Sequence, residues 1–347
     1  HAHRRYDESI QQNLTSHSGN RTNLLAPRRG KRLRWPPVSE SNTQTPNHAS
    51  EAGHGGGLAP RTRGLIELNV AVLIFAGTSL FAKLIPLPVS SIIFGRSAVA
   101  IAALAIYALV ARHSLRITSG RDALVFVGLG VLLAFHWLSY FRAIQVSSVA
   151  VGTISLHTYP IITVLIEPLF DRKRLHLVDA ILAIVVFAGI LVLVPEFTLA
   201  SAVSQGVLWG VVSAVLFTLR NLVTRRYVQR FSGAAIMFYQ IAVTAAILLP
   251  FVWARGGLPG TMENWAYFLV LGTIFTALAQ SLYAASLRHL SAKTVSIIAT
   301  LLPLYAAIAA IVVLDEVPTL RTIAGGAIVL GAVLTETIRA SRERGRR

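Results

Sequence analysis

The stretch HTYPIITVLIEPLFDRKRL, residues 157–175, is mostly apolar, yet it contains a histidine, a glutamate and two prolines and includes a run of charged residues. A second stretch of the same form, IIATLLPLYAAIAAIVVLDEVPTL, follows at residues 297–320. Pro160 and Pro303 stand 143 residues apart in these two stretches. Their recurrence predicts that the chain contains one structural unit twice.

Further matches at nearly the same spacing support a duplication. An offset of 143 residues pairs Tyr140 with Tyr283. The segment IIFGRSAVAIAA at 92–103 resembles IMFYQIAVTAAI at 236–247, at an offset of 144. The similarity therefore extends well beyond the two prolines.

The composition places most of the chain in a lipid bilayer. Hydrophobic residues make up 54% of the 347 positions and charged residues only 14%, whereas soluble domains carry about 25% charged residues. A membrane-spanning helix needs about 20 mostly apolar residues. Ten segments qualify and predict an all-α integral membrane protein with ten transmembrane helices: 64–85, 89–111, 122–142, 147–169, 176–195, 204–226, 232–254, 264–287, 292–314 and 319–338.

Each expected repeat, 63–200 and 201–338, holds five of these helices. Because five is odd, the second repeat must enter the membrane in the opposite orientation to the first. Inverted repeats are a common plan of secondary transporters, with the substrate site between them. Lysine and arginine gather in alternate short loops, which predicts that both termini are cytoplasmic. We expect a multi-pass protein of the bacterial inner membrane.

The formal net charge is +17, but the basic residues are concentrated outside the apolar segments, which argues against nucleic-acid binding. Residues 1–62 contain no apolar run and are expected to form a disordered basic tail. Residues 339–347 are expected to form a basic cytoplasmic tail. The chain has no cysteine, so it has no disulfide and no thiolate site. We expect neither a metal nor a cofactor.

This pattern resembles the drug/metabolite transporter superfamily and, within it, the ten-helix EamA-type branch. Besides the repeat itself, three local features carry the resemblance: the Pro160 and Pro303 segments, the Asp315-Glu316 turn and Arg96 in the second helix. The resemblance covers nearly all of residues 64–338 and implies export or exchange of small metabolites. One position departs from it, because the family often has glutamate after the fourth helix where this chain has Lys173.

Polar residues form one stripe on the fourth helix and a matching stripe on the ninth. Residues spaced three, four or seven apart share a face of a helix. Polar side chains in a membrane normally face the bundle interior or a water-filled cavity. We predict that the two stripes contribute these residues to a substrate site: Thr153, His157, Ser296 and Thr300.

Pro160 and Pro303 fall within these stripes. A proline inside a helix removes a backbone donor and frees the carbonyl four residues earlier, here that of Leu156 or Ala299. We expect the freed carbonyls to face a cavity and the two prolines to form kinks that bend during transport. The alternative is a pair of kinks that only shape helix packing.

Arg96 is a charged residue within the second helix, and its counterpart in the other repeat is Gln240. A guanidinium at that depth needs an anion, carbonyl groups or water. No acidic residue is predicted at similar depth. We therefore predict that Arg96, and Gln240 opposite it, contact an anionic substrate group; structural pairing or snorkelling of Arg96 is the alternative.

His136 and His157 are predicted at similar depth on adjacent helices. They would form either a protonatable pair near neutral pH or two neutral, hydrogen-bonded rings. Glu167 is expected to pair with Arg172 or Arg174 near the cytoplasmic end. Four residues at matching positions of the third and eighth helices are predicted to contact substrate or, alternatively, to face lipid: Trp137, Tyr140, Gln280 and Tyr283.

Together these features predict a secondary transporter, an exporter or exchanger, that moves a small polar metabolite such as an amino acid or organic anion by alternating access. One alternative is a proton-coupled exporter of cationic drugs, which would favour a carboxylate deep in the bundle. Another is an intramembrane enzyme, for which the sequence shows no reactive motif. The expected partners are a small-molecule substrate and the lipid bilayer. The Gly206–Gly210 spacing fits either a homodimer or packing within one bundle.

Overall fold

The computed structural model describes residues 59–344 except for short gaps at 111, 113–114, 118, 172–175, 197, 199, 228–229, 232, 256–260, 287–288 and 291. This part of the chain consists of helices and the turns between them, with no strand. Residues 1–58, which make up most of the expected N-terminal tail, and the last three residues lie outside it. So do Arg172, Lys173 and Arg174, the basic turn singled out in the sequence.

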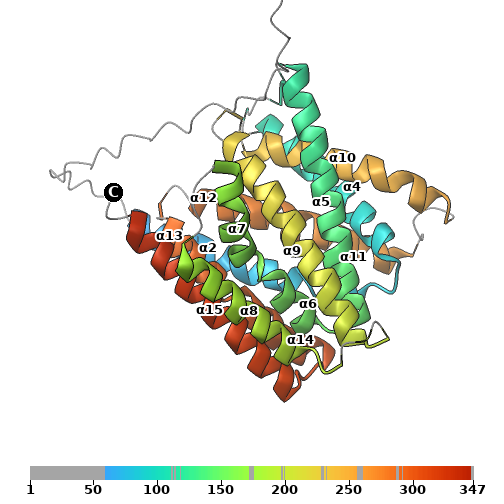
Figure 1. The fold of residues 1–347 in the computed structure, drawn as a ribbon. Helices are drawn as coiled ribbons and strands as arrows, with labels where there is room; N and C mark the ends of the chain where they lie inside the picture. Colours follow the sequence, from blue (N-terminus) through green and yellow to red (C-terminus); the bar gives the residue numbers. More distant parts are fainter. Residues whose placement is uncertain are drawn as a thin grey trace, which may run out of the picture. The chain divides into compact units, whose positions relative to one another are not determined.

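The helices fall into two sets of similar order (Figure 1). The first set is α2 Pro60–Thr78, α3 Phe81–Leu84, α4 Val89–Val110, α5 Gly120–Val146, α6 Val149–Leu156, α7 Tyr159–Asp171 and α8 Leu177–Leu193. The second set is α9 Ala202–Tyr227, α10 Gly233–Trp253, α11 Met262–Gly272, the π-helical η1 Thr273–Leu278, α12 Ala279–Ser286, α13 Ala292–Ala299, α14 Leu302–Leu314 and α15 Leu320–Arg344.

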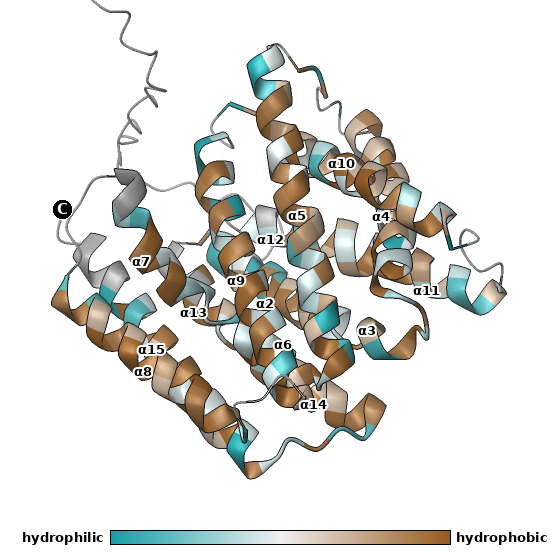
Figure 2. Cartoon of the chain, turned by 45° about the vertical axis from the view of Figure 1, so that its right-hand side comes forward, coloured by the Kyte–Doolittle hydropathy of each residue, from teal (hydrophilic) through white to brown (hydrophobic). Residues whose placement is uncertain are grey.

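Most of these segments have the length and composition of membrane spans. Eight helical stretches in the described part are long and apolar enough to cross a bilayer, and α8 is a shorter apolar helix. The continuous stretch α11–η1–α12 is the remaining segment. Leu177, Ile184 and Phe187 of α8 are between 62% and 77% exposed, and Figure 2 shows hydrophobic residues along the length of α8 and α15. The prediction of an all-α, multi-pass membrane protein is confirmed.

The two repeats pack against each other in matching pairs. Helix α5 packs on α9, and the equivalent α12 packs on α2; likewise α10 contacts α5, and α11 contacts α4. Two further pairs, α4 with α10 and α8 with α15, join helices that are equivalent in the two repeats. Figure 1 shows α8 beside α15 and α5 beside α9. This exchange of partners is what a two-fold relation between five-helix repeats requires.

Glycines at equivalent positions permit the close approach of these helices. A Cβ atom added at Gly130 would lie 2.5 Å from Val243 Cβ, and one at Gly272 would lie 2.7 Å from Val99 Cβ. Both distances are shorter than side chains tolerate. Inside a bilayer, where lipid is as apolar as leucine, such tight packing is a main source of helix association.

Gly206 and Gly210, the GxxxG pair, pack on this chain's own helices. A Cβ at Gly206 would lie 2.1 Å from Ser147 Oγ, and one at Gly210 would lie 2.4 Å from Ser155 Cβ. The spacing therefore serves packing within one bundle, and it gives no support for a homodimer.

The fourth and ninth spans are broken rather than kinked, which corrects the sequence-based expectation. Helix α6 ends at Leu156 and α7 begins at Tyr159; α13 ends at Ala299 and α14 begins at Leu302. Pro160 and Pro303 are consequently the second residues of new helices. A proline is tolerated there because the first N–H groups of a helix have no intrahelical acceptor.

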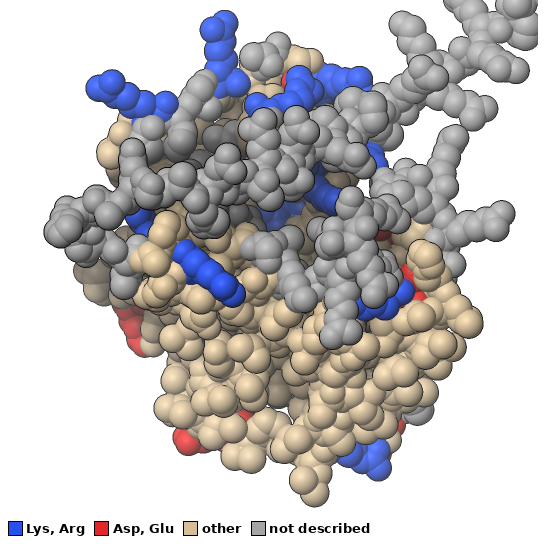
Figure 3. Space-filling view, turned by 90° about the vertical axis from the view of Figure 1, so that its left-hand side faces the viewer, with Lys and Arg blue, Asp and Glu red and all other residues tan. Residues whose placement is uncertain are grey.

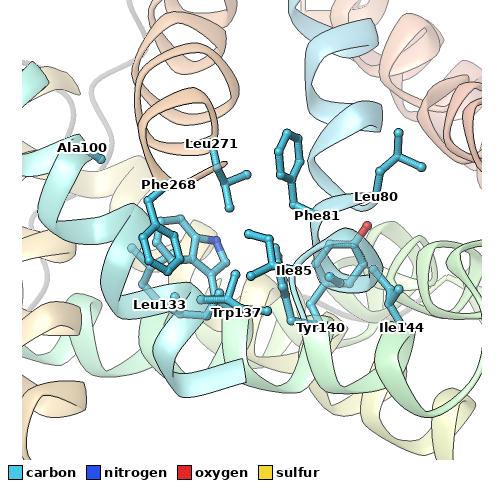
Figure 4. Packing of buried hydrophobic residues seen from close by; sticks show 14 of the residues in the cluster. Leu80, Phe81, Ile85, Ala100, Leu133, Trp137, Tyr140, Ile144, Phe268 and Leu271 are labelled. Atoms are coloured by element: carbon cyan, nitrogen blue, oxygen red, sulfur yellow. The ribbon is translucent and has the colours of Figure 1, made fainter. Parts of the chain in front are cut away.

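The main apolar cluster lies between both repeats and borders the site described below (Figure 4). Trp137 and Tyr140 of α5 lie in it, together with Phe81 of α3 and Phe268 and Leu271 of α11. Phe81 makes edge contacts with two aromatic rings of the second repeat, including Phe275 at a centroid distance of 4.9 Å. Packing across the repeats thus fixes the α5 side chains that face the cavity.

Candidate functional site

A cavity of about 640 Å³ lies among helices of both repeats. The discontinuous spans reach it at their breaks, because Leu156 and Ala299 both line it. These are the residues whose carbonyls were expected from the sequence to face a cavity, and they stand at the last positions of α6 and α13. Seven of the residues predicted from sequence also line the cavity: Arg96, His136, Trp137, Tyr140, His157, Gln280 and Tyr283.

Arg96 of α4 is the most buried charge in the cavity wall, with 3% of its surface exposed. Its Nη2 donates a hydrogen bond to Thr276 Oγ1 at 2.8 Å. The guanidinium carbon lies 4.2 Å from the centroid of the Trp137 ring, a cation–π contact. Its Nε is buried without a hydrogen-bond partner. A second ring, that of Phe141, lies 5.6 Å from the guanidinium carbon. The residues that the structure describes thus give this charge one hydroxyl and two aromatic rings, with no acid.

Thr276 was not predicted from sequence, and its position depends on the π segment η1. Its hydroxyl donates to the carbonyl of Leu271, five residues earlier, at 2.7 Å. That leaves the hydroxyl oxygen to accept from Arg96. Single π-helical turns often occur at functional sites, but nothing in the apolar pattern of residues 264–287 indicates one.

A second arginine of the wall, Arg220 of α9, was also missed. Its Nε donates to Gln240 Oε1 at 2.6 Å, and its Nη2 lies 3.5 Å from Met237 Sδ. Gln240 was predicted to line the site; it is fully buried and instead holds Arg220, and its own Nε2 has no partner. The sequence could have indicated Arg220, because it is an arginine next to an apolar run. It stands so close to Arg225, however, that the two arginines were interpreted together as the basic end of one helix.

Tyr140 connects the cavity to the broken fourth span. Its hydroxyl lies 3.2 Å from Thr153 Oγ1, and the Thr153 carbonyl lies 2.8 Å from His157 Nδ1. Thr153 is therefore buried behind the wall, where it supports two residues that line it. Of the two stripe residues predicted on the fourth span, His157 is among the residues that line the cavity and Thr153 is not.

The two histidines are anchored separately. His136 Nδ1 lies 2.7 Å from Ser213 Oγ and 3.1 Å from the Ser213 carbonyl on α9. His157 Nδ1 is bonded to its own helix at Thr153. No hydrogen bond joins the two rings within the described part of the chain. The arrangement matches two hydrogen-bonded rings rather than a mutual pair.

Of the two candidates of the ninth span, only Thr300 can be placed relative to the wall. The Thr300 hydroxyl donates to the Ile297 carbonyl at 2.6 Å and does not line the cavity. The Ser296 side chain lies outside the described residues. From the eighth span, Gln280 and Tyr283 of α12 contribute polar side chains to the described wall.

The cavity extends toward the helix ends that contain Arg225, Arg226 and Arg230, here called the basic end. Arg225 lines it and pairs with Glu167 of α7, Nη1 to Oε1 at 2.7 Å. The partners expected for Glu167, Arg172 and Arg174, lie outside the described residues. Figure 3 shows most lysine and arginine side chains of one face toward one end, above a broad uncharged area.

The opposite end, here called the Lys83 end, contains a partly buried ion pair. Helices α5 and α9 are antiparallel, since Gly206 approaches Ser147 whereas Arg230 pairs with Asp122. Lys83 Nζ lies 3.2 Å from Glu316 Oε1 and donates to the Ser147 carbonyl at 2.9 Å. Glu316 Oε2 accepts from the N–H of Val149 at 2.9 Å. The pair thus joins α3, the α5–α6 junction and the turn before α15.

Comparisons with known proteins agree with a duplicated transporter. Residues 62–194 and 204–336 each match the EamA-like transporter family. The chain is 29% identical over 248 residues to the pseudopaline exporter of Pseudomonas aeruginosa, covering 72% of this chain and 86% of that one. It is 26% identical over 263 residues to an uncharacterized transporter of Bacillus subtilis, covering 75% and 83%. A crystal structure with 18% identity covers 81% of this chain and 99% of its own with a TM-score of 0.57, which shows the same fold.

Proposed function

We propose, because the chain belongs to the EamA-like transporter family, that it carries small anionic metabolites across the bacterial inner membrane by alternating access between its repeats. The observation that carries the proposal is Arg96, a buried cavity charge whose described partners are neutral. Membership of a transporter family supports the movement of a small molecule as the activity. The arginines of the cavity wall support an anionic substrate.

The cost of Arg96 is the physical basis for this choice. Placing arginine at the centre of a membrane helix costs about 2.5–3.5 kcal/mol on insertion scales. Hydrogen bonds to a charged group contribute about 1.5–3 kcal/mol. A carboxylate or comparable anion within reach of Nε and the remaining N–H groups would offset much of that cost. The Trp137 ring already offsets part of it from one side.

The same wall disfavours the alternative of a cationic drug. Three arginines line the cavity, and its described lining residues include no aspartate or glutamate. A cation would meet Arg96 and Arg220 in a site of low dielectric, where like charges repel strongly. An amino acid remains compatible, because its carboxylate would face Arg96 and its ammonium group could meet the Tyr140 and Tyr283 rings.

For direction, we propose export. The positive-inside rule assigns the basic end to the cytoplasm, and Arg225 at that end lines the cavity. The Lys83–Glu316 pair joins segments of both repeats at the other end. This arrangement suits a state that is loaded from the cytoplasm. Exchange against a second molecule is the related alternative.

The test is transport into proteoliposomes by the purified protein. Labelled succinate, glutamate and tetraethylammonium are compared under the same conditions, with pH varied on either side of the membrane and with protein-free liposomes as the control. We expect protein-dependent movement of one or both carboxylates and none of tetraethylammonium. Movement of tetraethylammonium alone would overturn the proposal.

A further inference from the structure

We infer that the substrate carries two anionic groups, one bound by Arg96 of the first repeat and the other by Arg220 of the second. The inference rests on the proposed function and narrows it to a substrate class, small dianions such as dicarboxylates. It depends on Arg220 as well as on Arg96, the residue that carries the proposed function.

Arg220 has hydrogen-bonding capacity left over. A guanidinium has five N–H donors and no acceptor, and the described contacts of Arg220 use Nε and one Nη2 donor. The acceptor of the second contact is the thioether sulfur of Met237, which is weak. The first contact orients the guanidinium through Gln240, a neutral amide. Neither partner neutralises the charge.

Arg96, on another helix of the same cavity, likewise has unused N–H donors and no acidic partner among the described residues. Its hydrogen-bonded partner is the Thr276 hydroxyl, and its buried Nε has none. Both arginines line one cavity of about 640 Å³. The third arginine of the wall, Arg225, differs because it has Glu167 as a counterion at 2.7 Å. Two cations of the described wall are therefore left without an acid, which matches a ligand of charge −2.

The repeats divide the two charges between them. The counterpart of Arg96 is Gln240, whose side chain orients Arg220. The residue 142 positions before Arg220 is Thr78, which also lines the cavity but is uncharged. Each repeat thus supplies to the wall one cation that has no acidic partner among the described residues, and a neutral residue stands at the position equivalent to the other repeat's cation. A dianion with its charges at opposite ends would contact both repeats at once.

Such bridging has a consequence for selectivity. A monoanion can satisfy one guanidinium but leaves the other unpaired, and an unpaired buried charge is costly. The dianion should therefore bind more tightly than the monoanion, because it makes a second charge-assisted hydrogen-bonded contact. The free energy of such a contact corresponds to an affinity about 10- to 100-fold higher. Replacing either arginine should remove this advantage of the dianion. The two single variants should then bind a monoanion with similar affinity.

The experiment measures binding to the purified, detergent-solubilised chain by titration calorimetry. Unbranched dicarboxylates from malonate to suberate are each compared with the monocarboxylate of equal carbon number, and tetraethylammonium is included. We expect at least one dicarboxylate to bind about 10-fold or more tightly than its matched monocarboxylate. Arg96→Gln and Arg220→Gln should each abolish that ratio. Arg255→Gln is the matched control, since Arg255 is exposed beyond the cavity and bonded to Ser90.

Each other outcome has a defined meaning. Equal affinity of every dicarboxylate and its monocarboxylate, or an unchanged ratio in Arg220→Gln, would overturn this inference and leave an anion transporter. Binding of tetraethylammonium without any carboxylate, or no carboxylate binding at all, would overturn the proposed function as well. Arg220→Lys keeps the charge, so it should retain part of the ratio even if Arg220→Gln fails to fold.

Discussion

Replacing Glu316 by glutamine should shift the protein away from the conformation described here. Glu316 bonds Lys83 across 3.2 Å and accepts from the N–H of Val149, and its side chain is 24% exposed. Glutamine keeps the size and can still accept from Val149, so the change removes mainly the charge. A hydrogen bond to a charged group is worth about 1.5–3 kcal/mol and a neutral one about 0.5–1.5.

The difference, on the order of 1–1.5 kcal/mol, corresponds to a shift of roughly 5- to 10-fold in the equilibrium between conformations. The shift should favour states in which the Lys83 end is open, because the pair joins the segments that must separate there. The transport rate need not increase, because stabilising states with an open Lys83 end also makes the return to the conformation described here less favourable.

The chain has no cysteine, so one introduced thiol reports this opening. Ser79 lies fully buried between α2 and α3, and Ser79→Cys changes its size little. The labelling rate of that thiol by a membrane-impermeant maleimide, added from the Lys83 side, should rise about 5- to 10-fold with Glu316→Gln. Arg142→Gln is the control, because Arg142 is an exposed charge at the same end. Equal labelling rates in the two variants would refute the role given to the ion pair.

Two further predictions concern stability. Gly272→Ala should lower the melting temperature, because the new methyl group would meet Val99 Cβ at 2.7 Å and the Arg96 carbonyl at 2.9 Å, an overpacking that costs about 1–3 kcal/mol. Gly128→Ala is the control, because nothing lies within 4 Å of its added Cβ, and it should leave the melting temperature unchanged or raise it slightly. A lower melting temperature for Gly128→Ala than for Gly272→Ala would contradict the packing described. Arg225→Gln should change the melting temperature little, because its pair with Glu167 is partly exposed and such pairs contribute no more than about 1 kcal/mol; a large loss would mean that the pair supports the fold.

The sequence was sufficient for the spans and the duplication because both depend on local composition. About 20 apolar residues define a span wherever its neighbours lie, and the segments around Pro160 and Pro303 repeat almost in register. Arg96 could be selected for the same reason, since a charge in an apolar run stands out without knowledge of its partner.

What the sequence did not reveal depends on contacts between distant segments. Whether proline kinks a helix or begins a new one depends on where the preceding helix stops, and α6 stops at Leu156. The contact between Arg96 and Thr276 joins residues 180 positions apart and requires a π turn that helical periodicity does not encode. Arg220 was overlooked because its burial is decided by α10, through Gln240 and Met237.

The most direct test of the central claim is uptake of one labelled dicarboxylate, the tightest binder among those titrated, into proteoliposomes preloaded with the same unlabelled compound. Wild type, Arg96→Gln and Arg255→Gln are reconstituted at equal density and measured together. Wild type and Arg255→Gln should accumulate label, whereas Arg96→Gln should lose about 10-fold or more of the initial rate, the value of one charge-assisted contact to the substrate. Equal uptake by wild type and Arg96→Gln would contradict the claim that this cavity carries an anion on Arg96.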